Sequence, residues 1–297
     1  MQSIPKHLAG AYAHCQGVAR RHYENFPVAS VLVPAGLRPH VAAVYAFARR
    51  ADDFADEAHF SGCRTARLDA WERQLENALA GRARHPVFRA LSHTVAQFSL
   101  DPAPLFDLLS AFRQDVRVTR YRAFSELLDY CRRSANPVGR IVLALFGQDS
   151  ARNVAWSDAI CTALQLANFW QDVAVDRDKD RIYLPTEDMA RFGVSESDVL
   201  EGRVTDGFRE LMGFEVARTR NLFNVGRPLC QKVPGRLGYE LKAVWLGGMG
   251  ILDGVEAAGY DVFRARPAHG TRERLRFLAD TLFPGAFSRA AERYANG

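Results

Sequence analysis

This chain of 297 residues is 48% hydrophobic and 25% charged, which is the composition of a globular protein with a large core. Its net charge of +5 is small, and no run of lysine or arginine with interleaved aromatic residues appears, so we expect no nucleic-acid partner. The five cysteines form no Cys-x-x-Cys pair, which argues against the usual zinc sites and indicates reduced thiols in a cytoplasmic protein.

The chain reads as a succession of helices, because apolar residues recur at helical spacing and strand-like alternation is nearly absent. Glycine and proline residues separate the helical stretches. We expect helices at about 5–24, 37–60, 64–81, 86–98, 102–119, 123–147, 152–176, 206–231, 237–259 and 271–295. The sequence therefore predicts an all-α fold.

The second of these stretches carries a polar stripe. It consists, at spacings of four, three and four, of Tyr45, Arg49, Asp52 and Asp56. On a helix these spacings place the side chains within an arc of roughly 60°. Asp53 stands beside them, and most neighbouring positions are apolar. A polar line on an otherwise apolar helix indicates a helix that lines a polar cavity.

The seventh stretch carries a second stripe of the same kind. It consists, at spacings of three, four and four, of Gln165, Asn168, Asp172 and Asp176. These positions span an arc of roughly 80°. Apolar residues again surround the stripe, among them Phe169 and Trp170, which directly follow Asn168. We therefore interpret the two stripes together.

Each stripe contains carboxylates one helical turn apart, and four acids on two facing helices would repel one another unless a cation lay between them. Mg²⁺ prefers oxygen ligands and commonly keeps substrate phosphates in its shell. We predict a Mg²⁺-diphosphate site, with Mn²⁺ as the alternative ion. Its predicted metal ligands are Asp52, Asp53, Asp56, Asp172 and Asp176. The amides Gln165 and Asn168 would orient a water, the diphosphate or the hydration shell of the metal. Two solvated helix faces are the alternative interpretation.

The stretch 177–188 is charged and follows the second stripe. We expect a mobile flap that carries Lys179, Arg181 and Tyr183 over the site, with an ordinary solvated turn as the alternative. Upstream, Pro137 falls inside a helical pattern, where a proline should kink the helix and free backbone carbonyls.

Six segments follow one another in a specific order and spacing. They are His22-Tyr23-Glu24-Asn25-Phe26, Tyr45-Ala46-Phe47-Ala48-Arg49-Arg50-Ala51-Asp52-Asp53, Tyr130-Cys131, Asn136-Pro137-Val138-Gly139, Gln165-Leu166-Ala167-Asn168-Phe169-Trp170-Gln171-Asp172 and Asp180-Arg181-Ile182-Tyr183-Leu184-Pro185. With these segments the chain resembles the squalene/phytoene synthase family, from about residue 10 to about residue 265. The resemblance implies one domain over residues 1–297, an all-α class I isoprenoid synthase bundle around a central cavity, although length alone would suggest two domains.

Bound Mg²⁺ neutralises a diphosphate so that it can leave, and its departure leaves a carbocation. We expect Arg49 and Arg181, with Lys179 as a weaker candidate, to hold the diphosphate oxygens. The π faces of Tyr45 and Tyr183 would stabilise the carbocation and shelter it from water. The predicted catalytic residues are Tyr45, Asp52, Asp56, Asp172 and Asp176.

Three departures separate this chain from the pattern common in the family. Val175 stands where squalene and phytoene synthases commonly carry an acid. Tyr23 and Asn25 replace two serines, and Arg132-Arg133 stand where a tyrosine often follows Tyr-Cys. These departures disfavour a full two-step condensation of two farnesyl diphosphates.

Within the family, residues 22–27 and 168–176 most resemble the hydroxysqualene synthases of the bacterial hopanoid pathway. This resemblance implies a carbon–oxygen lyase that ionises presqualene diphosphate and lets water capture the rearranged cation. The alternative is a prenyltransferase: a presqualene diphosphate, squalene or phytoene synthase acting on prenyl diphosphates such as farnesyl diphosphate. A non-catalytic relative is a third interpretation, and loss of the aspartates would be its usual sign.

The same resemblance implies pathway partners, namely a presqualene diphosphate synthase and a flavoenzyme that reduces hydroxysqualene. No NADPH is expected, because the glycine cluster at 247–250 follows no strand and more readily serves close helix packing or an isoprenoid tail. Since no signal core or membrane span appears, we expect a cytoplasmic protein, with peripheral contact to the inner membrane allowed by a lipid substrate.

Two further side chains have open interpretations. Asp115 could line the cavity, or it could pair with Arg113 or Arg120. His22 could contact the pocket, although a satisfied core histidine is the better explanation.

Overall fold

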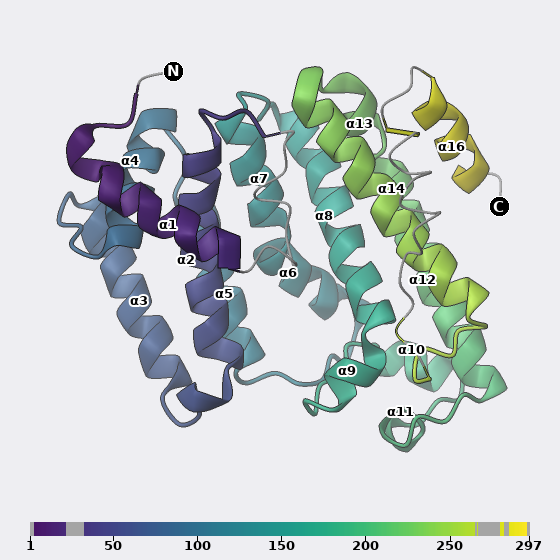
Figure 1. The fold of residues 1–297 in the computed structure, drawn as a ribbon. Helices are drawn as coiled ribbons and strands as arrows, with labels where there is room; N and C mark the ends of the chain where they lie inside the picture. Colours follow the sequence, from purple (N-terminus) through teal and green to yellow (C-terminus); the bar gives the residue numbers. More distant parts are fainter. Residues whose placement is uncertain (1–2, 22–32, 265, 267–279, 282–284, 296–297) are drawn as a thin grey trace. The chain divides into compact units, whose positions relative to one another are not determined.

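A computed structural model describes residues 3–21, 33–264, 266, 280–281 and 285–295 (Figure 1). The chain divides into two compact units. The first contains Met1–Arg117 and Pro137–Ser150, and the second contains Val118–Asn136 and Ala151–Gly297. The expectation of one domain over residues 1–297 stays a prediction.

The helices confirm the predicted all-α fold. The first unit contains η1 (Lys6–Leu8), α1 (Ala9–Arg21), α2 (Arg38–Asp56), η2 (Ala58–Phe60), α3 (Arg64–Leu79), α4 (Pro86–Phe98), α5 (Ala103–Asp115) and nearly all of α7 (Asn136–Leu145). The second contains α6 (Phe124–Ser134), α8 (Ala151–Gln171), α9 (Val173–Arg177), α10 (Thr186–Arg191), α11 (Glu196–Leu200), α12 (Asp206–Gly226), α13 (Pro228–Lys232), α14 (Gly235–Ala257) and α16 (Ala286–Ala295). No β-strand occurs among the described residues, which contain an isolated bridge between Arg120 and Ile182.

Helix α2 is the centre of the first unit, where it packs against α1, α3, α4 and α5. Its buried side includes alanines, among them Ala43 and Ala46, and the large rings of Phe47 and Phe54. The indole Nε1 of Trp71 donates to the Phe47 carbonyl oxygen at 3.2 Å, which fixes α3 against α2. Burial of this apolar side leaves the polar stripe of α2 on its other side.

A buried polar network joins α1 to α2 and α4. The Tyr12 hydroxyl lies 2.8 Å from His93 Nδ1, 3.1 Å from His40 Nδ1 and 3.0 Å from Thr94 Oγ1. Burial lowers the pKa of His40 to about 4, so this imidazole is neutral at pH 7. The network therefore satisfies buried polar groups without burying a charge.

Helix α8 is the centre of the second unit, and it packs on α12 and α14. Trp170 Nε1 donates to Thr219 Oγ1 at 2.8 Å, which joins α8 to α12. Trp245 Nε1 donates to the Phe223 carbonyl at 2.8 Å, which joins α14 to α12. A Cβ on Gly248 would lie 2.2 Å from the Phe223 ring, so α14 approaches α12 closely because this residue is a glycine. The helix-packing explanation of the glycine cluster is thereby supported.

A buried ionic group lies between α10, α12 and α6. Arg218 Nη2 lies 2.6 Å from Glu215 Oε2 and 2.8 Å from Asp188 Oδ2, and its guanidinium carbon lies 3.3 Å from the Phe124 ring centre. One guanidinium faces two buried carboxyl groups, and burial raises the pKa of Glu215 to about 8. Glu215 is therefore largely protonated at pH 7.

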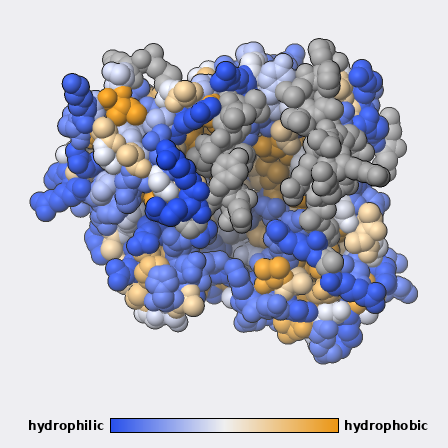
Figure 2. Space-filling view, in the orientation of Figure 1, coloured by the Kyte–Doolittle hydropathy of each residue, from blue (hydrophilic) through white to orange (hydrophobic). Residues whose placement is uncertain are grey.

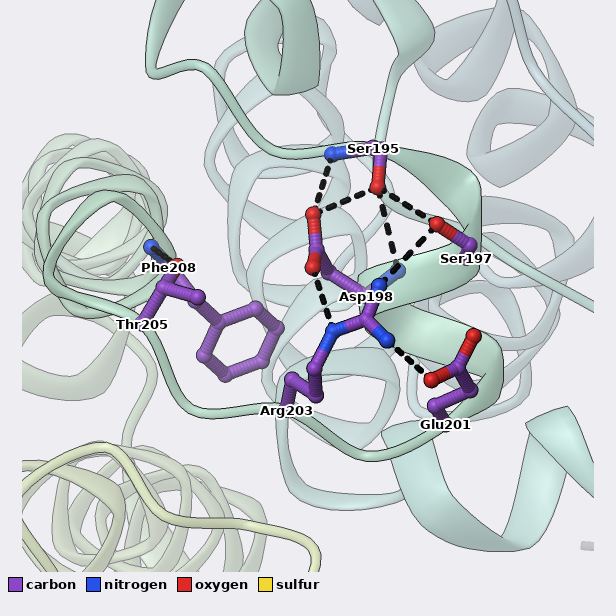
Figure 3. Close-up of polar contacts among 7 residues, drawn as sticks. All are labelled: Ser195, Ser197, Asp198, Glu201, Arg203, Thr205 and Phe208. Atoms are coloured by element: carbon purple, nitrogen blue, oxygen red, sulfur yellow. Dashed lines mark hydrogen bonds and ion pairs between the residues drawn. The ribbon is translucent and has the colours of Figure 1, made fainter.

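The start of α11 and the start of α12 are fixed by capping side chains (Figure 3). The Asp198 amide donates to Ser195 Oγ at 3.2 Å, and the Ser195 amide donates to Asp198 Oδ2 at 2.8 Å, which is a reciprocal capping box. Arg203 Nε donates to Asp198 Oδ1 at 2.7 Å. Thr205 caps α12 by accepting from the Phe208 amide at 3.1 Å.

Two predicted helices are interrupted in the structure. The stretch 123–147 forms α6 and α7, which are separated at Ala135, and Pro137 lies in the first turn of α7. The proline lacks an N–H, so the predicted kink is realised as a helix boundary. The stretch 152–176 is interrupted at Asp172, between α8 and α9.

Other boundaries differ by smaller amounts. The stretch 206–231 divides at Arg227, where Pro228 begins α13. Of the predicted helix 271–295, the structure describes α16, and residues 267–279 lie outside the described residues. The predicted helix 5–24 appears as η1 and α1, with residues 22–24 also outside the description.

On the face drawn in Figure 2, most described residues are hydrophilic and many of the hydrophobic ones form small spots. None of the described helices combines the length and the hydropathy that a bilayer crossing requires.

Candidate metal and diphosphate site

The first acidic motif, Asp52, Asp53 and Asp56, lies in the last turns of α2. Its carboxylates are partly exposed, with side-chain exposures of 41% for Asp52 and 18% for Asp53. Ala51, directly before the motif, and Ala55, within it, are buried. The motif is thus at the boundary between the core of the first unit and its surface.

Arg49 lies against this motif. Its Nη1 is 3.2 Å from Asp52 Oδ2, and its Nε is 2.8 Å from Asp53 Oδ1, an ion pair by distance without hydrogen-bond geometry. Its Nη2 lies 3.8 Å from Glu57, an acid that the sequence analysis did not include. Arg49 therefore serves as a counter-ion for the motif from which we predicted metal binding.

Tyr45 lies two turns before the motif and is half-buried. Burial raises the pKa of its hydroxyl, while Arg49 lowers it and Asp52 and Asp53 raise it. The hydroxyl is therefore protonated at neutral pH and can donate a hydrogen bond. Its predicted role toward a carbocation stays a prediction.

The second acidic motif, Asp172 and Asp176, lies where α8 passes into α9 (Figure 1). Asp172 leaves helical geometry, with φ −104° and ψ 15°. Its amide still donates to the Asn168 carbonyl at 2.9 Å, and the Asp176 amide donates to the Asp172 carbonyl at 2.8 Å. Asn168, Asp172 and Asp176 consequently occupy successive turns, as the spacing predicted. Gln165, one turn earlier, is half-buried.

Arg266 binds the second motif and was missed by the sequence analysis. Its Nη2 donates to Asp172 Oδ2 at 3.0 Å and to Gln171 Oε1 at 3.3 Å, and its Nε donates to Asp172 Oδ1. This two-pronged pairing raises the pKa of Arg266, with Asp176 adding to the effect. Arg266 is 94 residues from Asp172 in sequence, and no spacing rule could have paired them.

The expected flap has two different parts. The first part is a turn in which the amides of Lys179 and Arg181 both donate to the Asp176 carbonyl at 2.9 Å. Asp180, between them, has a φ of 57°. Arg120 fixes this turn through Asp180, at 2.7 Å. Lys179 is exposed and Arg181 is half-buried. These two cations thus lie within a few residues of the second motif.

The following part of the expected flap is anchored rather than loose. Ile182, Tyr183 and Leu184 are buried, and the Ile182 amide donates to the Thr119 carbonyl at 2.9 Å. The expectation of a flap over the whole of 177–188 is therefore wrong, and so is a fully solvated turn. The apolar residues anchor the segment because their burial removes them from water.

The ring of Tyr183 is stacked between aromatic neighbours. Its centre lies 3.7 Å from that of Phe169, at an interplanar angle of 9°, and 5.6 Å from that of Tyr121. Tyr130, the tyrosine of the Tyr-Cys pair, lies 6.2 Å from it. The rings form a buried aromatic cluster beside the second motif, so a π face of Tyr183 is shared with other rings.

The structure bears on one of the two side chains, Asp115 and His22, whose roles the sequence left open. Arg113 pairs with Asp69 at 3.0 Å and Arg120 pairs with Glu196 at 2.8 Å, so both arginines have other acidic partners than Asp115. Asp115 itself lies at the last position of α5. His22 is outside the described residues.

The donor chemistry of the two motifs fits Mg²⁺, because every predicted ligand is a carboxylate oxygen. Among the described residues, no three histidine, cysteine, aspartate or glutamate side chains already stand together at metal-ligating distances. In each motif an arginine contacts the carboxylates. A divalent cation would therefore have to draw these side chains away from arginine.

Comparisons with known proteins support one family. The sequence profile described as "Squalene/phytoene synthase" matches residues 19–274. The chain is 33% identical over 280 residues to 15-cis-phytoene synthase of Synechocystis sp., covering 90% of this chain and 83% of that protein. It is 32% identical over 297 residues to phytoene synthase 3 of Zea mays, covering 96% of this chain and 70% of that protein.

Solved structures show the same fold. The crystal structure of squalene synthase HpnC from Alicyclobacillus acidocaldarius is similar, with 46% identity, a TM-score of 0.83 and coverage of 86% of this chain and 97% of that one. A dehydrosqualene synthase in complex with ligand has 27% identity and a TM-score of 0.82, covering 93% and 96% of the two chains. The predicted all-α isoprenoid synthase fold is confirmed.

Proposed function

Since this chain belongs to the squalene/phytoene synthase family, whose members act on prenyl diphosphates, we propose that it is a hydroxysqualene synthase. The observation that carries the proposal is the resemblance of residues 22–27 and 168–176 to hydroxysqualene synthases. The 46% identity to squalene synthase HpnC, against 32–33% to phytoene synthases, supports it over a phytoene synthase. Val175 adds support, because an acid common elsewhere in the family is absent from the second motif.

In the proposed reaction, presqualene diphosphate and water give hydroxysqualene and diphosphate. The carbon–oxygen bond breaks and its electron pair leaves with the diphosphate; the cation rearranges, and water adds and loses a proton. No electrons are gained overall, so no NADPH is required. The reaction is that of a carbon–oxygen lyase.

Bound Mg²⁺ would neutralise the leaving diphosphate, held by Asp52, Asp53, Asp56, Asp172 and Asp176. Cationic side chains would bind the remaining diphosphate oxygens. Those of Arg49 and Arg181 offer planar forks, and Lys179 is exposed. An arginine that moves from a carboxylate to the diphosphate would replace a carboxylate oxygen by a diphosphate oxygen as its partner.

Once the diphosphate departs, the cation needs apolar surroundings and one placed water. Asn168 is exposed and Gln165 half-buried, and their amides can orient that water. Tyr45 would present its π face and its protonated hydroxyl. Tyr183 would stabilise the cation as a member of the aromatic cluster, through the side of the cluster that faces the substrate.

A phytoene, squalene or presqualene diphosphate synthase is the second candidate, because the similar curated proteins are phytoene synthases. That enzyme would be a prenyltransferase that joins two prenyl diphosphates. In the first proposal, by contrast, a presqualene diphosphate synthase supplies the substrate and a hydroxysqualene-reducing flavoenzyme uses the product. We place both versions in the cytoplasm.

The test is to incubate the purified protein with Mg²⁺ and either presqualene diphosphate or farnesyl diphosphate, without a reductant. Hydroxysqualene from presqualene diphosphate, with no product from farnesyl diphosphate, is the expected result. A C30 or C40 product from prenyl diphosphates alone would establish the second candidate instead. Asp172→Asn should reduce turnover by orders of magnitude. Asp206→Asn, at a fully exposed helix start, is the matched control.

A further inference from the structure

One end of the second unit combines cations that form no ion pair with any described residue and apolar side chains that are exposed. It is built where α8 begins, α12 ends, and α13 and the first turns of α14 follow (Figure 1). We propose that this end docks on an anionic lipid bilayer. We call it the basic end, and it consists of Arg152, Val225, Arg227, Lys232, Arg236 and Tyr239. This inference does not depend on which reaction the protein catalyses.

The elements of the basic end lie together. A Cβ on Gly226 would lie 2.4 Å from Ile160 Cγ1, so the end of α12 touches the first half of α8. Helix α13 packs on α8, α12 and α14. The Cys230 thiol contacts the Leu241 carbonyl at 3.4 Å, which holds α13 on α14. The side chains named above therefore belong to one end of the unit rather than to scattered positions.

The cations of this end differ from most other arginines of the unit. Within the described residues, Arg152, Arg227, Lys232 and Arg236 form no ion pair. Elsewhere the unit matches its arginines with acids, as for Arg120 with Asp180 and Glu196. Between residues 225 and 242 the sequence has four cationic residues and one acid, Glu240. Among the residues that the structure describes, the four cations of the basic end thus have no acidic partner.

Apolar side chains stand among these cations. Val225 is 59% exposed and Tyr239 is 38% exposed, and both are large hydrophobic residues that the core does not use. Lys242 lies 5.2 Å from the Tyr239 ring centre, so the ring and a cation share one surface. Tyrosine and valine can enter the headgroup region while lysine and arginine remain at the phosphates.

Charge and apolar exposure together favour a bilayer over other anionic partners. The phosphates of a nucleic acid would pair with the cations, but Val225 would remain exposed to water. A bilayer of anionic lipids offers negative charge at its surface and an apolar interior directly beneath it. Along the 20 residues from Arg152 to Asp172, α8 rises about 30 Å, so the basic end is remote from the second acidic motif. Docking would therefore leave that motif uncovered.

The test is sedimentation of the purified protein with vesicles of phosphatidylcholine, with and without phosphatidylglycerol. We expect binding to the anionic vesicles, weakened by added salt, and little binding to the neutral ones. The variant Arg227→Gln/Lys232→Gln/Arg236→Gln should bind anionic vesicles about tenfold more weakly or worse. Val225→Ser/Tyr239→Ser should bind more weakly too, with an unchanged salt dependence.

A control variant separates this surface from net charge. Arg122→Gln/Arg209→Gln/Arg264→Gln also removes three positive charges from the unit, at exposed positions paired with neighbouring acids. It should bind vesicles as the unmodified protein does. Equal loss in both variants, or no binding of the unmodified protein to anionic vesicles, would overturn the proposal. Circular dichroism melts verify that each variant is folded.

Discussion

At the scale of single residues, both acidic motifs are in contact with an arginine. Arg49 lies within 3.2 Å of Asp52 and Asp53, and Arg266 binds both oxygens of Asp172. A guanidinium and a divalent cation compete for the same carboxylate oxygens. Metal binding should therefore depend on how easily these arginines are displaced.

Replacing Arg266 by glutamine removes that competitor. We expect Arg266→Gln to bind Mg²⁺ roughly two- to fivefold more tightly than the unmodified protein in the absence of substrate. Isothermal titration with Mg²⁺ measures this directly. The control is Arg264→Gln, two residues before Arg266, which removes a surface ion pair with Asp261. This variant should leave the affinity for Mg²⁺ unchanged. Weaker binding by Arg266→Gln would show that Arg266 orients Asp172 for the metal instead.

Glu215 gives a residue-scale prediction for stability against pH. Its pKa is about 8 in the folded protein, above the ordinary value of 4.5, so the folded state holds a proton that the unfolded state releases. The free energy of unfolding should therefore fall as pH rises from about 4.5 to about 8, by up to about 4 kcal/mol. Urea denaturation across this range measures the fall.

Glu215→Gln should remove most of this pH dependence, since the amide stays neutral and keeps a hydrogen-bonding oxygen for Arg218. Glu210→Gln on the same helix, at an exposed position, is the control. An unchanged slope in Glu215→Gln would mean that Arg218 keeps Glu215 ionised throughout.

At the scale of helices, two adjacent glycines of α14 have different surroundings. A Cβ on Gly248 would lie 2.2 Å from the Phe223 ring and 3.0 Å from Leu164, whereas nothing lies within 4 Å of a Cβ on Gly247. The close approach of α14 to α12 thus requires glycine at one position and leaves the other free for a side chain.

We expect Gly248→Ala to destabilise the protein by about 2 kcal/mol, because the ring of Phe223 must move in a packed core. Gly247→Ala should be neutral or stabilising by roughly 0.5–1 kcal/mol, since alanine favours helix over glycine. Thermal denaturation of the two variants makes the comparison. Equal destabilisation by both would argue against close packing at Gly248.

At the scale of the whole molecule, the two acidic motifs belong to different compact units. The proposed function requires both motifs to bind one metal-diphosphate ligand. A ligand that binds the folded state raises the free energy of unfolding, by about 2.7 kcal/mol at a concentration one hundred times its Kd.

We expect Mg²⁺ with inorganic diphosphate to raise the melting temperature of the unmodified protein, and either Asp52→Asn or Asp172→Asn to abolish the rise. Each variant lacks a carboxylate that the proposed function requires. Asp206→Asn should keep the full rise. Should Asp52→Asn and Asp172→Asn each retain about half of it, the motifs would bind independently, contrary to the proposal.

The helical fold and the order of the polar stripes could be predicted from the amino-acid sequence alone. Helical periodicity depends on spacing along one segment, so the faces of α2 and α8 followed from residue positions alone. The position of Pro137 predicted a kink within one helix, and the structure has a boundary between α6 and α7 there, because the proline ring removes a backbone donor locally. The six family segments, read in order, identified the family that the comparisons confirm.

Contacts between residues far apart in the sequence could not be predicted and are known from the folded structure. Arg266 on Asp172, Glu57 near Arg49, and the stacking of Tyr183 on Phe169 depend on how the chain turns between elements. The same holds for Ile182–Leu184, which a charged sequence context presented as a flap and which burial fixes in the core. Helix spacing is set by local backbone geometry, whereas these contacts are set by burial of apolar surface and pairing of charge across the whole unit.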